Sequence, residues 1–102
     1  MAWHEVASAN DLQEEEATPV TVGKTMIALY KVGEQVYGTS NVCTHQFALM
    51  SDGFVDDDCI ECPLHQARFH IPTGAYKDGP ECADLKTYPV KIENGMVYVD
   101  CD

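Results

Sequence analysis

The sequence has few positive charges. Six lysine and arginine residues stand against 17 aspartates and glutamates, which gives a formal net charge of −11. Such a chain repels nucleic acid and anionic membrane surfaces, so neither is expected as a partner. A partner with a basic surface is attracted instead, at a rate that falls as the salt concentration rises. The acidic surface also keeps a small protein soluble, and we expect a monomer.

Long apolar runs are also lacking. No stretch is long enough to span a bilayer, and the N-terminal segment Met1–Glu5 has neither the basic nor the apolar region of a secretory signal. A cytoplasmic protein is therefore expected. The 102 residues suit a single domain over residues 1–102, and the 45% content of hydrophobic residues excludes a disordered tail.

A sustained helical period is missing as well, whereas short strand-like segments alternate with turn signals. The runs Thr25–Val32 and Gln35–Thr39 indicate a hairpin across the intervening glycine. Near the C-terminus, Asn94-Gly95 is the preferred dipeptide of a two-residue type I′ turn. It predicts a second hairpin between strands at residues 88–93 and 96–100.

These segments predict an all-β fold. The two hairpin regions, approximately residues 1–40 and 77–102, are expected to form the antiparallel β-sandwich or barrel base. The stretch 41–76 differs in character and is predicted to be a small metal-binding insert on that base. Its short strand candidates are Phe54-Val55, Ile60-Glu61 and Ala67–Ile71.

Five cysteines in a chain without a secretory signal favour metal ligation over a disulfide framework. Cys43-Thr44-His45 and Cys62-Pro63-Leu64-His65 are two Cys/His couples, with sixteen residues between His45 and Cys62. Each couple offers one thiolate and one imidazole. Such a set suits two unlike metal positions, one bound by both sulfurs and the other by both nitrogens. This is the ligand set of a Rieske [2Fe-2S] centre, in which two histidines replace two cysteines on one iron.

Other interpretations of the couples remain open at this point. Structural zinc also accepts two cysteines and two histidines, although zinc sites usually pair like ligands. An all-cysteine cluster could use Cys43, Cys59, Cys62 and Cys82, but the plant-type ferredoxin spacing is absent and two imidazoles would be left unused. Chance neighbours in a core are a further alternative. We interpret Cys59 as a buried strand residue, and we assign no role to Cys82 or Cys101.

Cys43-Thr44-His45 followed by Cys62-Pro63-Leu64-His65 resembles the signature of the Rieske family. The wider run from Cys43 through Asp100 resembles the ferredoxin components of bacterial aromatic-ring-hydroxylating dioxygenase systems. Its other matching stretches are Ser51-Asp52-Gly53, Ile60–Gln66, Thr73-Gly74 and Lys86–Lys91. The resemblance implies a Rieske fold and one [2Fe-2S] cluster, with Cys43 and Cys62 on one iron and His45 and His65 on the outer iron. It also implies that Gly79-Pro80 belongs to a loop that covers the cluster.

Two departures from the family bear on the reduction potential. Rieske proteins of respiratory complexes bridge their cluster loops with a disulfide, where this chain has Ala48 and Leu64. They also offer Ser and Tyr hydroxyls to the cluster sulfurs, where this chain has Ala67 and Phe69. Fewer hydrogen bonds leave the reduced cluster less stabilised. We therefore expect a potential at the low end of the Rieske range, about −150 mV.

By the same resemblance the chain is a one-electron carrier of aromatic hydrocarbon catabolism. It is expected to take electrons from an NAD(P)H-dependent ferredoxin reductase and to pass them to a terminal oxygenase. It is not expected to be an enzyme, because 102 residues leave no room for a second, mononuclear-iron domain. His4 and His70 are interpreted as ordinary surface or strand residues. Two alternatives stay open: a Rieske-like small subunit of a larger reductase such as nitrite reductase, and a structural zinc module.

Overall fold

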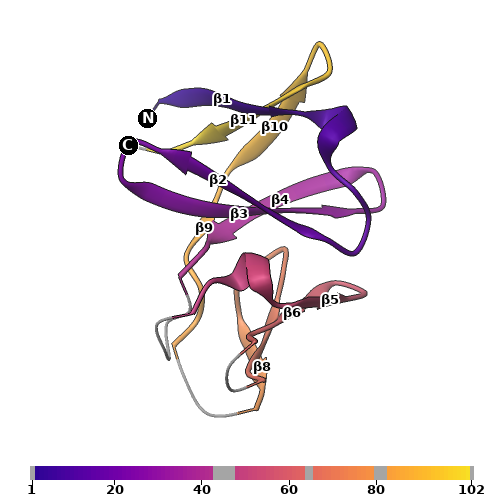
Figure 1. Cartoon of the computed structure of the whole chain (residues 1–102), viewed down its shortest axis with the longest axis vertical. Helices are drawn as coiled ribbons and strands as arrows, with labels where there is room; N and C mark the ends of the chain where they lie inside the picture. The colour runs from indigo at the N-terminus through magenta and orange to yellow at the C-terminus, as the bar shows by residue number, and fades with distance from the viewer. Residues whose placement is uncertain (1, 43–47, 64–65, 80–82, 102) are drawn as a thin grey trace.

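The structure is a computed structural model that describes residues 2–42, 48–63, 66–79 and 83–101. Within these residues the chain forms eleven β-strands and two short 3-10 turns, η1 (Ala9–Asp11) and η2 (Met50–Asp52), and no α-helix. No helix that could cross a membrane occurs in this part of the chain. The strands form three antiparallel sheets (Figure 1), so the all-β prediction is confirmed.

The first sheet brings the two ends of the chain together. Its order is β1-β11-β10, with β1 (Trp3–Ser8), β11 (Met96–Asp100) and β10 (Val90–Glu93). The turn between β10 and β11 is Asn94-Gly95, whose φ angles of 52° and 77° are those of the predicted type I′ turn. The Cys101 N–H donates to the Ala2 carbonyl (3.1 Å), and the Ala2 N–H donates to Asp100 Oδ1 (2.9 Å). The first and last described residues therefore lie side by side.

The second sheet is a meander with one additional short strand. Its order is β2-β3-β4-β9, with β2 (Ala17–Val22), β3 (Thr25–Val32), β4 (Gln35–Ser40) and β9 (Thr87–Tyr88). The hairpin of β3 and β4 is confirmed. The prediction of one strand over residues 88–93 is wrong, because β9 pairs with β4 whereas β10 pairs with β11. Pro89 separates the two strands, since proline has no N–H to donate to a ladder.

The third sheet is built entirely from the chain between β4 and β9. Its order is β5-β6-β7-β8, with β5 (Phe54–Asp56), β6 (Cys59–Glu61), β7 (Arg68–His70) and β8 (Tyr76–Asp78). Figure 1 shows β5, β6 and β8 below the first two sheets. β8 was not expected from the sequence. Two of its three residues are charged, so the segment lacks the apolar alternation of a half-buried strand.

One strand of the second sheet is buried on both faces. Ile27, Ala28, Leu29 and Tyr30 of β3 are all 0% exposed. Because side chains alternate along a strand, these residues face two different cores. Ile27 and Leu29 belong to a first core shared by the first and second sheets, with Leu12, Val97, Val99 and Cys101. Ala28 and Tyr30 belong to a second core that includes the third sheet, with Ala48, Met50, Ile60, Cys62, Ala67, Phe69, Ile71 and Leu85. β3 therefore joins the third sheet to the rest of the fold.

A histidine fastens two turns of the third sheet to each other. His70 Nε2 lies 3.0 Å from Asp58 Oδ2 in the β5–β6 turn, and His70 Nδ1 lies 2.9 Å from Thr73 Oγ1 after β7. The Cys59 thiol donates to Asp58 Oδ1 (3.5 Å). The hydrogen bond from Cys59 and the contact with His70 hold the pKa of Asp58 below its usual value, although desolvation opposes them.

We expect Gly53→Ala to destabilise the fold by about 1–3 kcal/mol or more, the usual cost of inserting atoms into a packed site. A Cβ at Gly53 would lie only 2.1 Å from the Glu61 carbonyl oxygen, so backbone must move. Urea unfolding measures the loss. Gly23→Ala is the matched control, because its Cβ meets nothing within 4 Å and only the positive φ of 59° is penalised. Equal losses in the two variants would contradict the steric explanation.

The lowered pKa of Asp58 predicts a specific loss of stability in acid. A carboxylate with a depressed folded-state pKa stabilises the fold above the unfolded-state value of ~3.9, and this stabilisation disappears as the pH falls through the folded-state pKa. Asp58→Asn should therefore lower the free energy of unfolding at pH ~6, and this deficit should shrink as the pH falls through the folded-state pKa. Urea unfolding at a series of pH values from there downward checks this, with the exposed turn residue Glu34→Gln as control. A deficit of Asp58→Asn that stays the same at every pH would refute the explanation.

Candidate metal centre

Of the four predicted ligands, Cys62 lies among the described residues. Cys43, His45 and His65 lie outside them. Cys62 directly follows β6 and is fully buried in the second core. Ile60, two residues earlier on β6, belongs to the same core. The alternation of the strand thus carries the Cys62 side chain into the interior rather than toward solvent.

A tight turn carries the chain from Cys62 back into β7. The Cys62 N–H donates to the Ala67 carbonyl (2.8 Å), and the Gln66 N–H donates to the Cys62 carbonyl (3.0 Å). Gln66 has a left-handed φ of 62°, a conformation that suits such a reversal. These two hydrogen bonds keep Cys62 close to Gln66 and Ala67.

Gly79 packs directly against this turn. A Cβ on Gly79 would lie 2.7 Å from the Gln66 carbonyl oxygen and 2.8 Å from Ala67 Cα, so no larger residue fits without a backbone shift. The Tyr76 hydroxyl donates to the Gly79 carbonyl and holds the end of β8 in place. Pro80, predicted to share a covering loop with Gly79, lies outside the described residues.

Residues near the three undescribed internal segments pack together in the second core. Ala48 directly follows residues 43–47, Cys62 and Ala67 lie on the two sides of residues 64–65, and Leu85 lies three residues after residues 80–82. All four are at most 8% exposed, and all belong to the second core. Sequence segments far apart in the chain are therefore gathered around Cys62. Such a gathering is what a metal centre built from two separate Cys/His couples requires.

Cys62 belongs to the second core together with apolar side chains. Ala67 and Phe69 are fully buried in the same core and offer no hydroxyl group. The hydroxyl of Tyr30, also in this core, is 2.7 Å from Thr39 Oγ1. Burial raises the pKa of Tyr30 far above its usual value, despite the opposing hydrogen bond, so the hydroxyl stays neutral. A core of this kind excludes water from the thiolate side of a cluster.

Cys59 is engaged away from this core, which weakens the all-cysteine alternative. Its thiol contacts Asp58, and Lys77 Nζ donates to Cys59 Sγ at 3.4 Å. Cys59 is 1% exposed, in agreement with its interpretation as a buried strand residue. Cys101, 6% exposed, lies in the first core, and Cys82 lies outside the described residues.

The two histidines outside the couples have structural partners. His70 contacts Asp58 and Thr73, and His4 Nε2 lies 3.2 Å from the Cys101 carbonyl oxygen. Within the described ranges, no group of three or more His, Cys, Asp or Glu side chains could hold a metal ion. This part of the chain therefore offers no second metal centre of that kind.

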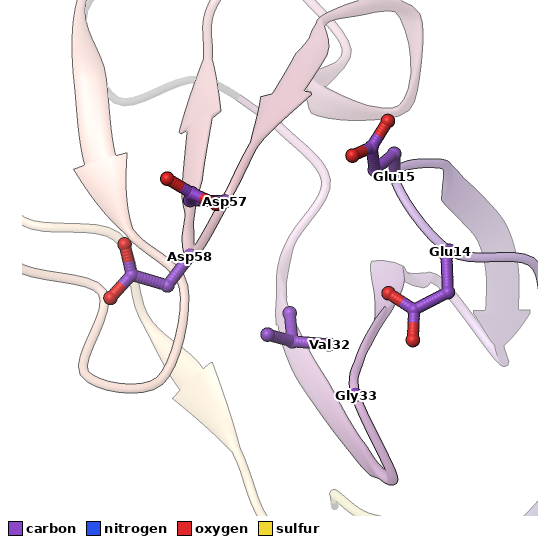
Figure 2. A pocket seen from close by; sticks show the side chains of 6 residues that line it. All are labelled: Glu14, Glu15, Val32, Gly33, Asp57 and Asp58. Carbon is purple, nitrogen blue, oxygen red and sulfur yellow. The ribbon is translucent and has the colours of Figure 1, made fainter.

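A pocket of about 470 Å³ collects acidic side chains between the base and the third sheet. Figure 2 shows Glu14 and Glu15 on one side of it and Asp57 and Asp58 on the other, with Val32 and Gly33 of the β3–β4 hairpin between them. Asp58 is already paired with His70. The pocket concentrates negative charge on this side of the molecule and strengthens its attraction for basic surfaces.

Comparisons with known proteins agree with this geometry. The sequence model of the Rieske [2Fe-2S] domain family matches residues 2–89. The ferredoxin component of the naphthalene 1,2-dioxygenase system of Pseudomonas putida is 46% identical over 98 residues, which cover 96% of this chain and 94% of the relative. Two solved structures are also similar: a ferredoxin of Sphingomonas yanoikuyae B1, and the ferredoxin in a complex of reduced oxygenase and oxidized ferredoxin of carbazole 1,9a-dioxygenase.

The structural agreement extends over the whole domain. The Sphingomonas ferredoxin has a TM-score of 0.93 and 37% identity, and the match covers 99% of this chain and all of the other. The carbazole dioxygenase ferredoxin has a TM-score of 0.89 and 39% identity, with 95% and 91% of the two chains covered. The buried Cys62 turn and the gathered flanking segments fit the donor set of a Rieske centre. The chain therefore belongs to the Rieske [2Fe-2S] domain family and carries one [2Fe-2S] cluster.

Proposed function

We propose that this protein is the ferredoxin of a bacterial ring-hydroxylating dioxygenase system. It carries one electron at a time to a terminal oxygenase and is not itself an enzyme. The observation that carries this proposal is the near full-length similarity to relatives named as ferredoxin components of such systems. The similar ferredoxin found in complex with its oxygenase supports the direction of transfer. The donor of the electrons is proposed to be an NAD(P)H-dependent ferredoxin reductase.

The cluster ligands are proposed to be Cys43 and Cys62 on one iron and His45 and His65 on the other. The buried position of Cys62 and its backbone hydrogen bonds to Gln66 and Ala67 support this assignment. When bound, the cluster accepts and releases single electrons. The protein supplies an apolar core on the sulfur side, and the absence of hydroxyl groups on Ala67 and Phe69 favours a potential near the low end of the Rieske range.

The working form is proposed to be a cytoplasmic monomer with one domain over residues 1–102. Its base comprises residues 1–40 and 77–102, and the insert 41–76 carries the ligands. The third sheet supports this division, although β8 extends to Asp78 and so crosses the proposed boundary. Contacts with both redox partners must form and dissociate rapidly, so they are expected to be small and steered by charge.

Purified protein should be red-brown and, after reduction with dithionite, should give an EPR signal with the low average g value of a histidine-ligated cluster. Cys62→Ser should abolish or strongly alter this signal, because it removes a proposed ligand. His45→Cys should change its g values, because sulfur replaces nitrogen on the outer iron. The matched control is Cys59→Ser, since Cys59 is also buried and lies three residues before Cys62. Cys59→Ser should keep the wild-type signal.

Opposite outcomes would overturn the assignment. A colourless protein that contains only zinc would exclude the cluster. A cluster signal that is lost in both Cys59→Ser and Cys62→Ser but is unchanged in His45→Cys would favour the all-cysteine alternative. Retention of the wild-type signal in Cys62→Ser would exclude Cys62 as a ligand.

Electron transfer to the oxygenase should slow by about tenfold or more between low salt and ~0.5 M salt, because screening removes the steering of an acidic protein toward a basic surface. The formal net charge of −11 is the basis of this expectation. Stopped-flow reduction of the oxygenase by the reduced protein measures the rate. Reduction of a small neutral acceptor over the same salt range is the control. A rate to the oxygenase that does not change with salt would show that charge does not steer this encounter.

A further inference from the structure

Asn41 is a polar residue buried almost completely at the entrance to the first ligand segment. It directly follows β4, stands two residues before Cys43, and is 1% exposed. A buried side-chain amide costs free energy unless its donor and acceptor groups are both hydrogen-bonded. Asn41 lies outside both Cys/His couples. The cost of burying it therefore needs another explanation.

Both ends of the Asn41 amide are bonded to a single residue on the far side of the ligand segment. The Ser51 N–H donates to Asn41 Oδ1 at 2.7 Å, and Asn41 Nδ2 donates to Ser51 Oγ at 3.0 Å. Ser51 lies in η2, which follows the segment. The two residues thus form a two-point clamp across the residues between them, which include Cys43 and His45.

The backbone of Asn41 is fixed in the same way. Its N–H donates to the Met26 carbonyl on β3 (2.9 Å), and its carbonyl accepts from the Met50 N–H (2.7 Å). Val42 and Leu49 then form an antiparallel bridge. Asn41 is therefore anchored to β3 on one side and to the return of the ligand segment on the other. At position 41, alanine would offer neither the side-chain donor nor the acceptor. Aspartate would lack the Nδ2 donor and would bury a charge.

We propose that Asn41 is a positioning residue of the metal centre: its clamp on Ser51 sets the separation of the two ends of the segment that presents Cys43 and His45. This inference rests on the proposed assignment of those two ligands. The clamp acts through the ends of the segment and not through contact with the cluster. It therefore determines how firmly the ligands are held, and its loss affects the cluster more than the stability of the fold.

Three variants test the clamp, with cluster loss to an excess of an iron chelator and the EPR g values as readouts. Asn41→Ala should accelerate cluster loss about 10- to 100-fold, the size of effect seen when groups that orient metal ligands are removed. It should also shift the g values. Ser51→Ala keeps the bond from the Ser51 N–H and loses only the bond to Oγ, so its effect should have the same direction and be smaller.

Thr39→Val is the matched control. Thr39 is 0% exposed, lies on the adjoining β4, and loses a buried side-chain bond of 2.7 Å to Tyr30. It should lower the Tm yet keep the wild-type g values and a rate of cluster loss within about twofold. If the rate of cluster loss rises in proportion to the fall in Tm in all three variants and the g values stay unchanged, the proposed role of the clamp is wrong. The proposed function would still stand. Wild-type protein without the histidine-ligated signal would overturn both.

If Asn41→Ala does not fold, Ser51→Ala decides the matter. A cluster as persistent as the wild type in Ser51→Ala, with unchanged g values, would overturn the proposal. Faster loss without a matching fall in the Tm would support it.

Discussion

The burial of β3 on both faces is the constraint on which the remaining structure depends. A strand that lies in the middle of a sheet and between two cores cannot shift by one residue without moving every side chain into the wrong core. Ile27 and Leu29 fix the first sheet in this way, and Ala28 and Tyr30 fix the third. The core that contains the proposed ligand Cys62 is thus packed against β3. Met26 of the same strand also accepts a backbone hydrogen bond from Asn41.

Local patterns in the sequence were sufficient for much of the fold. The hairpin of β3 and β4 and the Asn94-Gly95 turn were predictable because turn chemistry and alternation act over a few residues. The division of residues 87–93 between two sheets was missed. Pro89 indicates a break in the hydrogen bonding of this segment. Which sheet the residues before and after it join is decided only by tertiary pairing. β8 was missed for a similar reason, since its place is set by pairing with β7 rather than by its own composition.

In the candidate site too, features set by neighbouring residues were predictable from the sequence, whereas contacts between distant residues were not. The two Cys/His couples were visible in the sequence because the ligand types and their spacing are chemically specific. The residues that support them were not. Asn41 was missed because nothing in its neighbours reveals that its amide meets Ser51. The steric role of Gly79 was missed because the backbone it touches, at Gln66 and Ala67, is distant in sequence. In the sequence, the local signs of these roles are an Asn two residues before Cys43 and a Gly directly before Pro80.

The pairing of Ala2 with Asp100 and Cys101 joins the first and last described residues on the base, and Figure 1 shows the two ends of the chain far from β8. A tether attached at either end would therefore leave the third sheet uncovered. The protein could be immobilised on an electrode or fused to a reductase without covering this sheet, where the proposed ligand Cys62 directly follows β6. Joining the two ends with a short linker would also be geometrically simple, which makes the scaffold suited to circular permutation.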